Sequence, residues 1–275
     1  MSIQQSIIKT LKYSHIFEFP LTDEEIYKFL IAETNYSYKK IKNLLNNLVR
    51  NKKIVKRDGH YFLPLGNLDW LIKREKSNRL FDVVFNKSKK DLRFLFKMPF
   101  VKFIGITGSV AAKNISNSAD VDLFIISSKN YLWLTRLITV IYLKIKKKYR
   151  NPYCPNLYVS VDNLTWDTKN VYVANEIARI VPIFNKDMSF EKFLVKNSWV
   201  ISYLPNFKNY LPKFKLRFKN YFLNYLFFPI EFTLFVFQYI YMKKNITKET
   251  VSLKKILFAK NDYSSKILSR FDQNL

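Results

Sequence analysis

The 275-residue chain has little of the residue types that carry thiol and imidazole chemistry. Its one cysteine, Cys154, excludes an internal disulfide framework and a cysteine-rich zinc site. Its two histidines, His15 and His60, argue against histidine-rich metal sites and relays of several imidazoles. Any divalent cation is therefore expected on oxygen ligands, which favours Mg²⁺ or Mn²⁺.

Acidic residues are also scarce, with 21 Asp and Glu against 47 Lys and Arg, a net charge of +26. Such an excess is compatible with a polyanionic partner. The charge is spread along the chain, however, from +5 in residues 1–66 to +10 in residues 191–275. No segment is a dedicated nucleic-acid arm, so the charge permits phosphate binding without proving it.

Signals for export and membrane insertion are weak. The first residues lack the charged, apolar and small-residue succession of a signal peptide, so we expect a cytoplasmic protein. Residues 221–242 are long enough to cross a bilayer, with Glu231 as their only charge. A central carboxylate costs about 2.5–3.5 kcal/mol on insertion scales, and Pro229 and Gln238 add to the difficulty. We therefore predict a buried, aromatic-rich helix or helix pair, and no membrane partner.

Residues 1–66 have the pattern of a winged helix-turn-helix. Thr22 and Glu25 have the spacing of a capping box, which begins a helix. Residues 37–50 then place apolar side chains at helical spacing, and Asp58-Gly59 is a favoured hairpin turn between two short strands. The polar face of the 37–50 helix is basic and amide-rich, as in helices that read DNA. The module is expected to contact either DNA or a protein.

Two helical regions flank the remaining core. Residues 67–97 are predicted to form one or two connecting helices, and residues 191–275 a C-terminal helical region. The predicted buried side of the connecting helices consists of Trp70, Leu71, Leu80, Val83 and Val84.

Glycine is rare, and its placement draws attention to residues 101–126. Two of the four glycines, Gly105 and Gly108, lie three residues apart where a predicted strand, 101–107, runs into a short helix. After a polar loop, residues 120–126 form a second predicted buried strand that begins with two carboxylates. Gly108 and Ser109 thus form a turn that can present backbone amides and a hydroxyl to a phosphate.

Asp120 and Asp122 are the only carboxylates between Asp91 and Asp162. The two-residue period of a strand places both on one face, roughly 7 Å apart, where they can share a cation. Carboxylates that hold a metal opposite a phosphate-binding turn are the arrangement that nucleotidyl transfer requires.

The strand, Gly108-Ser109, ten intervening residues and Asp120-Val121-Asp122-Leu123 together resemble the nucleotidyltransferase superfamily typified by DNA polymerase beta. The resemblance implies an α+β fold with a mixed-sheet transferase core, here residues 98–190. It also implies two Mg²⁺ ions on the first two acids and a third acid that activates a hydroxyl. The expected reaction moves a nucleoside monophosphate, AMP from ATP, to a hydroxyl acceptor and releases pyrophosphate.

The third acid is assigned to Asp162, at the end of a predicted strand over residues 157–162. It is expected to join Asp120 and Asp122 as a metal ligand and catalytic residue. Asp167 and Glu176 are competing candidates, and a salt bridge to Arg179 is the alternative role of Glu176. If none of the three serves, the domain binds nucleotide without turnover.

Several alternatives stay open. Lys113 and Arg136 have the charge to reach a triphosphate, although residues of this kind are more often solvated helix charges. The chain is alternatively a non-catalytic regulator, with a nucleotide-sensing core and a DNA-binding winged helix. A further alternative is a transferase that neutralises a toxin by modifying a partner protein.

Overall fold

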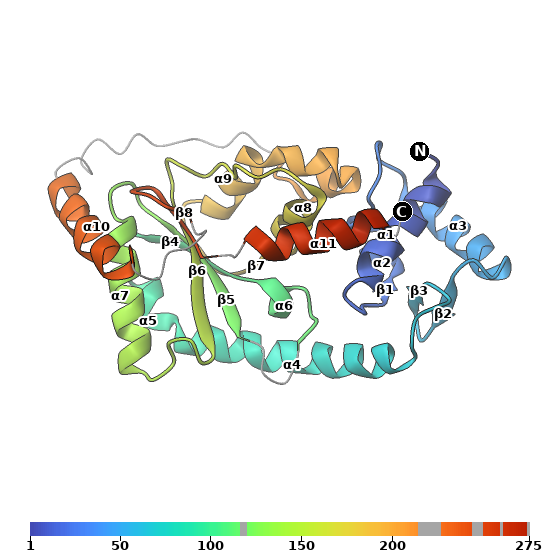
Figure 1. Cartoon of the computed structure of the whole chain (residues 1–275), viewed down its shortest axis with the longest axis horizontal. Helices are drawn as coiled ribbons and strands as arrows, with labels where there is room; N and C mark the ends of the chain where they lie inside the picture. Colours follow the sequence, from blue (N-terminus) through green and yellow to red (C-terminus); the bar gives the residue numbers. More distant parts are fainter. Residues whose placement is uncertain (116–119, 214–226, 244–249, 259–260, 274–275) are drawn as a thin grey trace.

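A six-stranded mixed sheet lies at the centre of the larger part of the molecule (Figure 1). The computed structural model describes residues 1–115, 120–213, 227–243, 250–258 and 261–273. Neighbouring strands β5 and β6 run parallel, and the other neighbours are antiparallel. The strands follow the order β7 (Val181–Asn185), β4 (Val101–Thr107), β5 (Val121–Ser127), β6 (Tyr153–Ser160), β9 (Lys255–Leu257) and β8 (Thr250–Val251). The mixed α+β class is therefore confirmed.

Both faces of the sheet are covered, which explains why β4 and β5 are apolar almost throughout. Phe103 and Phe124 point into one core, and Ile104 and Ile125 point into the other. The first core is closed by α8 (Val171–Arg179), α9 (Ser189–Lys196) and α11 (Asn261–Gln273). The second is closed by α5 (Arg93–Phe96), α7 (Leu132–Ile145) and α10 (Phe228–Lys243). The short α6 (Gly108–Ala111) links β4 to the loop before β5.

The N-terminal module, residues 1–66, has its own apolar core around Ile7, Ile26 and Ile41. The predicted capping box is confirmed, because Thr22 and Glu25 bond each other's backbone amides. The predicted hairpin is also confirmed, with the two-residue turn Asp58-Gly59 at positive φ. Its elements are α1 (Ile3–His15), β1 (Leu21–Thr22), α2 (Asp23–Lys28), α3 (Tyr38–Arg50), β2 (Val55–Arg57) and β3 (His60–Phe62).

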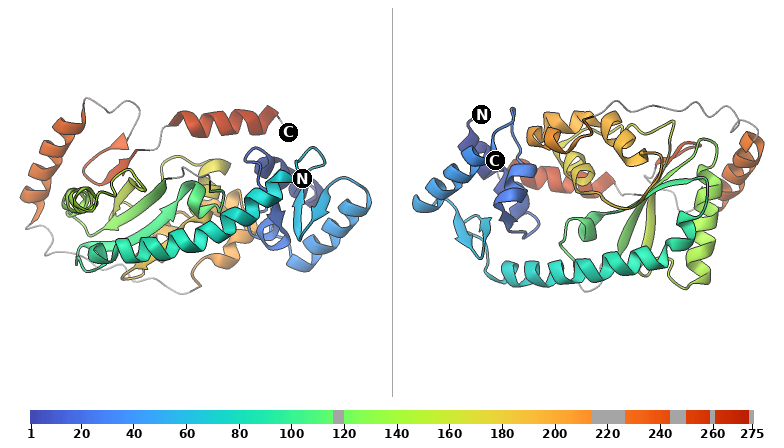
Figure 2. Two further views of the ribbon diagram at one scale, coloured as in Figure 1. Left: turned by 90° about the horizontal axis from the view of Figure 1, so that it is seen from below. Right: turned by 180° about the vertical axis from the view of Figure 1, so that it is seen from behind.

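One long helix, α4 (Asp69–Asp91), runs beside both parts of the molecule (Figure 2). Arg74 donates to Glu25 of the module at 2.5 Å, and Ser77 exchanges hydrogen bonds with the backbone of Ile115 in the core. Three of the four buried side chains of α4 are thus polar or charged: Arg74, Ser77 and Ser88. Val83, predicted to be buried, is 63% exposed, because the helix packs along an edge and is not enclosed.

The C-terminal region is less helical than predicted. It contains α9, two 3₁₀ segments (Ser198–Ser202 and Pro205–Tyr210), α10 and α11. It also contributes the β8–β9 hairpin, because β9 pairs with the otherwise open edge of β6. A β-hairpin therefore interrupts the region predicted to be helical.

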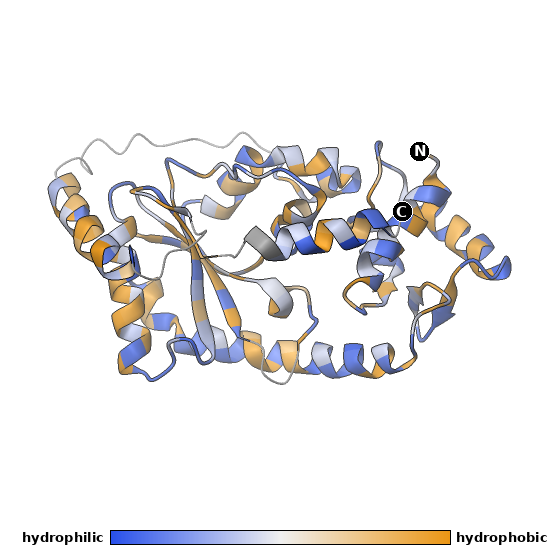
Figure 3. Ribbon diagram, viewed as in Figure 1, coloured by the Kyte–Doolittle hydropathy of each residue, from blue (hydrophilic) through white to orange (hydrophobic). Residues whose placement is uncertain are grey.

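Helix α10 packs Glu231 and Gln238 inward. The Glu231 carboxylate accepts the backbone N–H of Trp133 at 2.6 Å and of Leu134 at 3.2 Å, which caps α7. The outward face is apolar (Figure 3), with Phe237 69% exposed. The prediction of a buried helix is therefore wrong for this face, and residues 221–226 lie outside the described residues. Within the described ranges, no helix combines the length and apolar character needed to traverse a bilayer.

Candidate functional site

The turn between β4 and α6 lies directly against one of the two predicted carboxylates. Gly108 has φ +65°, a left-handed conformation that glycine adopts without a steric penalty. Thr107 pairs with Asp122 across the strands, which brings the Asp122 side chain beside Gly108. A Cβ atom at residue 108 would lie 3.3 Å from Asp122 Cγ and would collide with Oδ2. The structure therefore brings Gly108 and Asp122 together. The next residue, Ser109, is exposed.

The two predicted carboxylates share one edge of the sheet. Asp120 is exposed just before β5, and Asp122 is half-buried within it. Burial, together with the smaller effect of the nearby Asp120 charge, raises the pKa of Asp122 to about 6. Asn156 on β6 donates to Asp122 Oδ1, whereas no Lys or Arg of the described residues forms an ion pair with either acid. A carboxylate pair of this kind, with one exposed and one half-buried member, is electrostatically suited to a cation.

Cys154 completes the β6 side of this edge. It pairs with Asp122 in the parallel register, and its thiol is hydrogen-bonded to Asp120. Burial and the two carboxylates raise the pKa of the thiol to about 12. The thiol therefore stays protonated at neutral pH and acts as a donor, not as a nucleophile.

A cavity of about 150 Å³ lies between the Gly108-Ser109 turn and the N-terminal module. Five of its thirteen lining residues are aromatic: Tyr13, Phe17, Phe19, Tyr172 and Tyr263. The volume is below the 300–1,000 Å³ of most small-molecule sites. The enclosed part is therefore large enough for only a portion of a nucleotide.

Glu176 enters this cavity from α8 and accepts the backbone N–H of Gly108. Burial raises its pKa to about 7; Arg179 lowers it and the charge of Asp122 raises it. One amide expected to receive a phosphate thus already has a carboxylate partner. The glycine spacing predicted the turn but gave no sign that a helix more than sixty residues later would reach it.

Arg179, the expected salt-bridge partner of Glu176, lies flat on an aromatic ring. Its guanidinium carbon is 3.9 Å from the ring centroid of Phe29, and burial lowers its pKa. It also lines the cavity, so it adds a positive charge beside the aromatic side chains and Glu176.

Asp162 lies far from the pair, which corrects its assignment as the third acid and metal ligand. It follows the carboxyl end of β6, where Ser160 pairs with Ser127 at the end of β5. Asp122 and Ser127 are five residues apart on β5, which corresponds to about 16 Å at ~3.3 Å per residue. At that end Asp162 accepts Ser160 Oγ at 2.5 Å and pairs with Lys254 at 2.9 Å.

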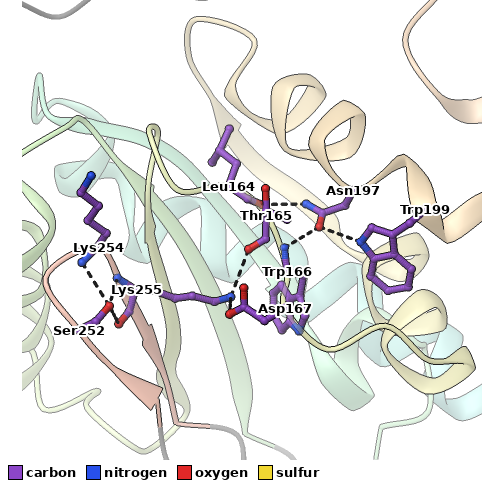
Figure 4. A network of polar contacts seen from close by, with 9 residues as sticks. All are labelled: Leu164, Thr165, Trp166, Asp167, Asn197, Trp199, Ser252, Lys254 and Lys255. Atoms are coloured by element: carbon purple, nitrogen blue, oxygen red, sulfur yellow. Dashed lines mark hydrogen bonds and ion pairs between the residues drawn. The ribbon is translucent and has the colours of Figure 1, made fainter.

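Asp167 also has a structural partner, since Lys255 Nζ lies 2.6 Å from its carboxylate (Figure 4). Beside it, the Asn197 amide accepts the Trp166 N–H at 2.8 Å and the Trp199 indole N–H at 3.2 Å (Figure 4). The same amide donates to Leu164 and Phe193 carbonyls. This network ties the 162–170 loop to α9 and leaves Asp167 outside the site.

Across the part of the chain that the structure describes, no group of three or more His, Cys, Asp or Glu side chains is placed to hold a metal. Asp120 and Asp122 therefore stand as a pair. No protein-family model, curated protein or solved structure matches the chain. Any function must therefore be inferred from the geometry of the site itself.

Proposed function

We propose that the chain is a nucleotidyltransferase that binds a nucleoside triphosphate with Mg²⁺ and moves its nucleoside monophosphate, AMP from ATP, to a hydroxyl. Pyrophosphate is the second product. The central supporting observation is the contact between Gly108 and the Asp122 carboxylate, which puts the Gly108-Ser109 turn beside the paired acids. The proposed fold is a transferase core preceded by a winged helix-turn-helix.

The residues present fit a divalent cation. Oδ2 of Asp122 occupies the space that a Cβ at residue 108 would fill, and Asp120 supplies a second, exposed carboxylate. Hard cations prefer such oxygen ligands, and phosphate oxygens would add to the two acids. Asp120 and Asp122 would together hold one or two Mg²⁺ ions. When bound, the metal offsets the negative charge that develops on the phosphoryl oxygens.

The chain's own groups orient the nucleotide. The backbone amides and hydroxyl of Gly108-Ser109 face the phosphates, and a phosphate replaces Glu176 at the Gly108 amide. Replacement is assisted by the raised pKa of Glu176, since a protonated carboxyl repels phosphate less. Arg179 adds a cation to the same cavity, and the aromatic side chains suit stacking against a base.

One observation favours a second candidate, a regulator that binds nucleotide without turnover. The β6 side chains beside Asp122 are Cys154 and Asn156, so the adjacent strand supplies no third carboxylate there. In this candidate the exposed face of α3, which includes Lys39, Lys40 and Asn43, binds DNA. The two candidates differ in whether nucleotide is consumed.

The test is incubation of the purified chain with labelled nucleoside triphosphates, Mg²⁺ and a cell lysate. Pyrophosphate release and a labelled acceptor, both abolished in Asp122→Asn, would support transfer. Nucleotide binding without release in any lysate would support the regulator.

A further inference from the structure

A second and larger cavity, of about 820 Å³, lies on the β6 side of the acid pair. Its walls come from α7, α10 and the beginning of β6. The volume lies within the range of sites that enclose a whole small molecule. This cavity is separate from the one beside Gly108, because the two share no lining residue.

Two residues of the second cavity also contact the carboxylates. Cys154 and Asn156 belong to its wall. The Cys154 thiol bonds to Asp120, and the Asn156 amide donates to Asp122. A molecule in this cavity would therefore touch the β6 residues that bond to the acid pair, on the side of β5 away from the Gly108-Ser109 turn.

The charge of the second cavity is positive. Arg136, Lys144 and Arg150 line it, whereas none of its lining residues is Asp or Glu. Arg136 is only 9% exposed; it donates to Gln238 at 2.6 Å, but its buried Nε has no hydrogen-bond partner. Within the described ranges no carboxylate forms an ion pair with Lys144 or Arg150. Unpaired cations around a partly buried guanidinium are suited to a phosphate.

The same cavity has aromatic walls. Tyr149, Phe237, Tyr241 and Phe258 line it, and Lys144 and Arg150 each lie 5.7 Å from the Tyr149 ring centroid. Cations next to aromatic rings suit a ligand that combines a phosphate with a planar ring. A nucleoside monophosphate has this combination.

We propose that the second cavity binds the acceptor and that the acceptor is a phosphorylated nucleoside. This inference rests on the proposed transferase function. In the reaction, the acceptor hydroxyl oxygen bonds to the α-phosphorus of the triphosphate, and the bond from that phosphorus to the bridging oxygen breaks. Pyrophosphate leaves with the electron pair, and the hydroxyl proton is released to water.

The test measures AMP binding by isothermal titration calorimetry without Mg²⁺ or triphosphate. Lys144→Gln and Arg150→Gln should each weaken AMP binding about tenfold, through loss of one charge-assisted hydrogen bond. Lys146→Gln is the matched control, because Lys146 is exposed and does not line the cavity. Adenosine and ribose 5-phosphate serve as probes of the ring and the phosphate alone, and each should bind more weakly than AMP.

Equal AMP affinity in Lys144→Gln, Arg150→Gln and Lys146→Gln would overturn the inference, as would adenosine binding as tightly as AMP. Pyrophosphate release is measured in parallel to separate the two proposals. If pyrophosphate is released but neither Lys144→Gln nor Arg150→Gln changes the AMP affinity, the transferase proposal holds and the acceptor site in this cavity is refuted. Loss of AMP binding in the cavity variants without any release would support the site and remove the transferase.

Discussion

The absent side chain of Gly108 leaves the space into which the Asp122 carboxylate fits. The two residues are fourteen positions apart and are brought together by the antiparallel pairing of Thr107 with Asp122. The left-handed φ of Gly108 turns the chain into α6 at this point. The Gly108-Ser109 turn and the carboxylates of Asp120 and Asp122 therefore lie side by side, and each can be altered separately by substitution.

Gly108→Ala should destabilise the protein more than Gly59→Ala. Both glycines have positive φ, so alanine at either position costs about 1 kcal/mol in backbone conformation. At residue 59 an added Cβ meets nothing within 4 Å, whereas at residue 108 it meets Asp122. Denaturant unfolding should give an additional loss of about 1–2 kcal/mol for Gly108→Ala. Equal losses for the two variants would contradict the close packing of Asp122 on residue 108.

Glu231→Gln should lower the free energy of unfolding by about 1–3 kcal/mol, because a buried charged acceptor for two amides of α7 is replaced by a neutral amide. Glu231 is 3% exposed, so water cannot substitute for it. Glu75→Gln is the control, since Glu75 is 70% exposed and pairs with Arg79, itself 74% exposed. The control should change stability by less than about 0.5 kcal/mol. Similar effects of the two substitutions would refute the capping role of Glu231.

Glu176 should make the protein less stable as the pH rises toward neutrality. Burial raises its pKa from 4.5 to about 7, so between these values the folded chain holds a proton that the unfolded chain releases. Stability therefore falls as the pH rises through that window and levels off above about pH 7, by on the order of 2 kcal/mol once its partial solvent exposure is allowed for. Glu176→Gln should flatten this part of the profile in denaturant unfolding at several pH values. An unchanged slope would show that Glu176 is not responsible.

The outward face of α3 offers a test of nucleic-acid binding. Replacing Lys39, Lys40 and Lys42 with alanine should weaken DNA binding and make its salt dependence shallower, by up to about 0.9 for each phosphate that is no longer neutralised. Lys42 also pairs with Asp23 at 3.7 Å, so its part in the effect is expected to be smallest. Fluorescence anisotropy at several salt concentrations measures both quantities. DNA binding that is unchanged in the triple variant would assign the module to protein contacts.

Local sequence signals predicted local structure well. The strand at residues 101–107, the Thr22 capping box and the Asp58-Gly59 hairpin each depend on neighbouring residues, and all three are present in the structure. The position of Asp162 depended instead on the parallel register between β5 and β6, which sets the strand end at which it lies. Hydropathy alone likewise placed α10 in the core, whereas the capping of α7 by Glu231 turns its apolar side outward.

The most direct measurement of the central claim is Mg²⁺-dependent pyrophosphate release from ATP by the wild-type chain, Asp122→Asn and Asp162→Asn, with lysate as the source of acceptor. Asp122→Asn removes a carboxylate from the proposed metal site while relieving repulsion with Asp120, so the fold should survive and release should fall by roughly three orders of magnitude. Asp162→Asn changes a carboxylate at the opposite end of β6 and should leave the rate within about threefold of wild type. Release that depends on Asp162 and not on Asp122 would contradict the account.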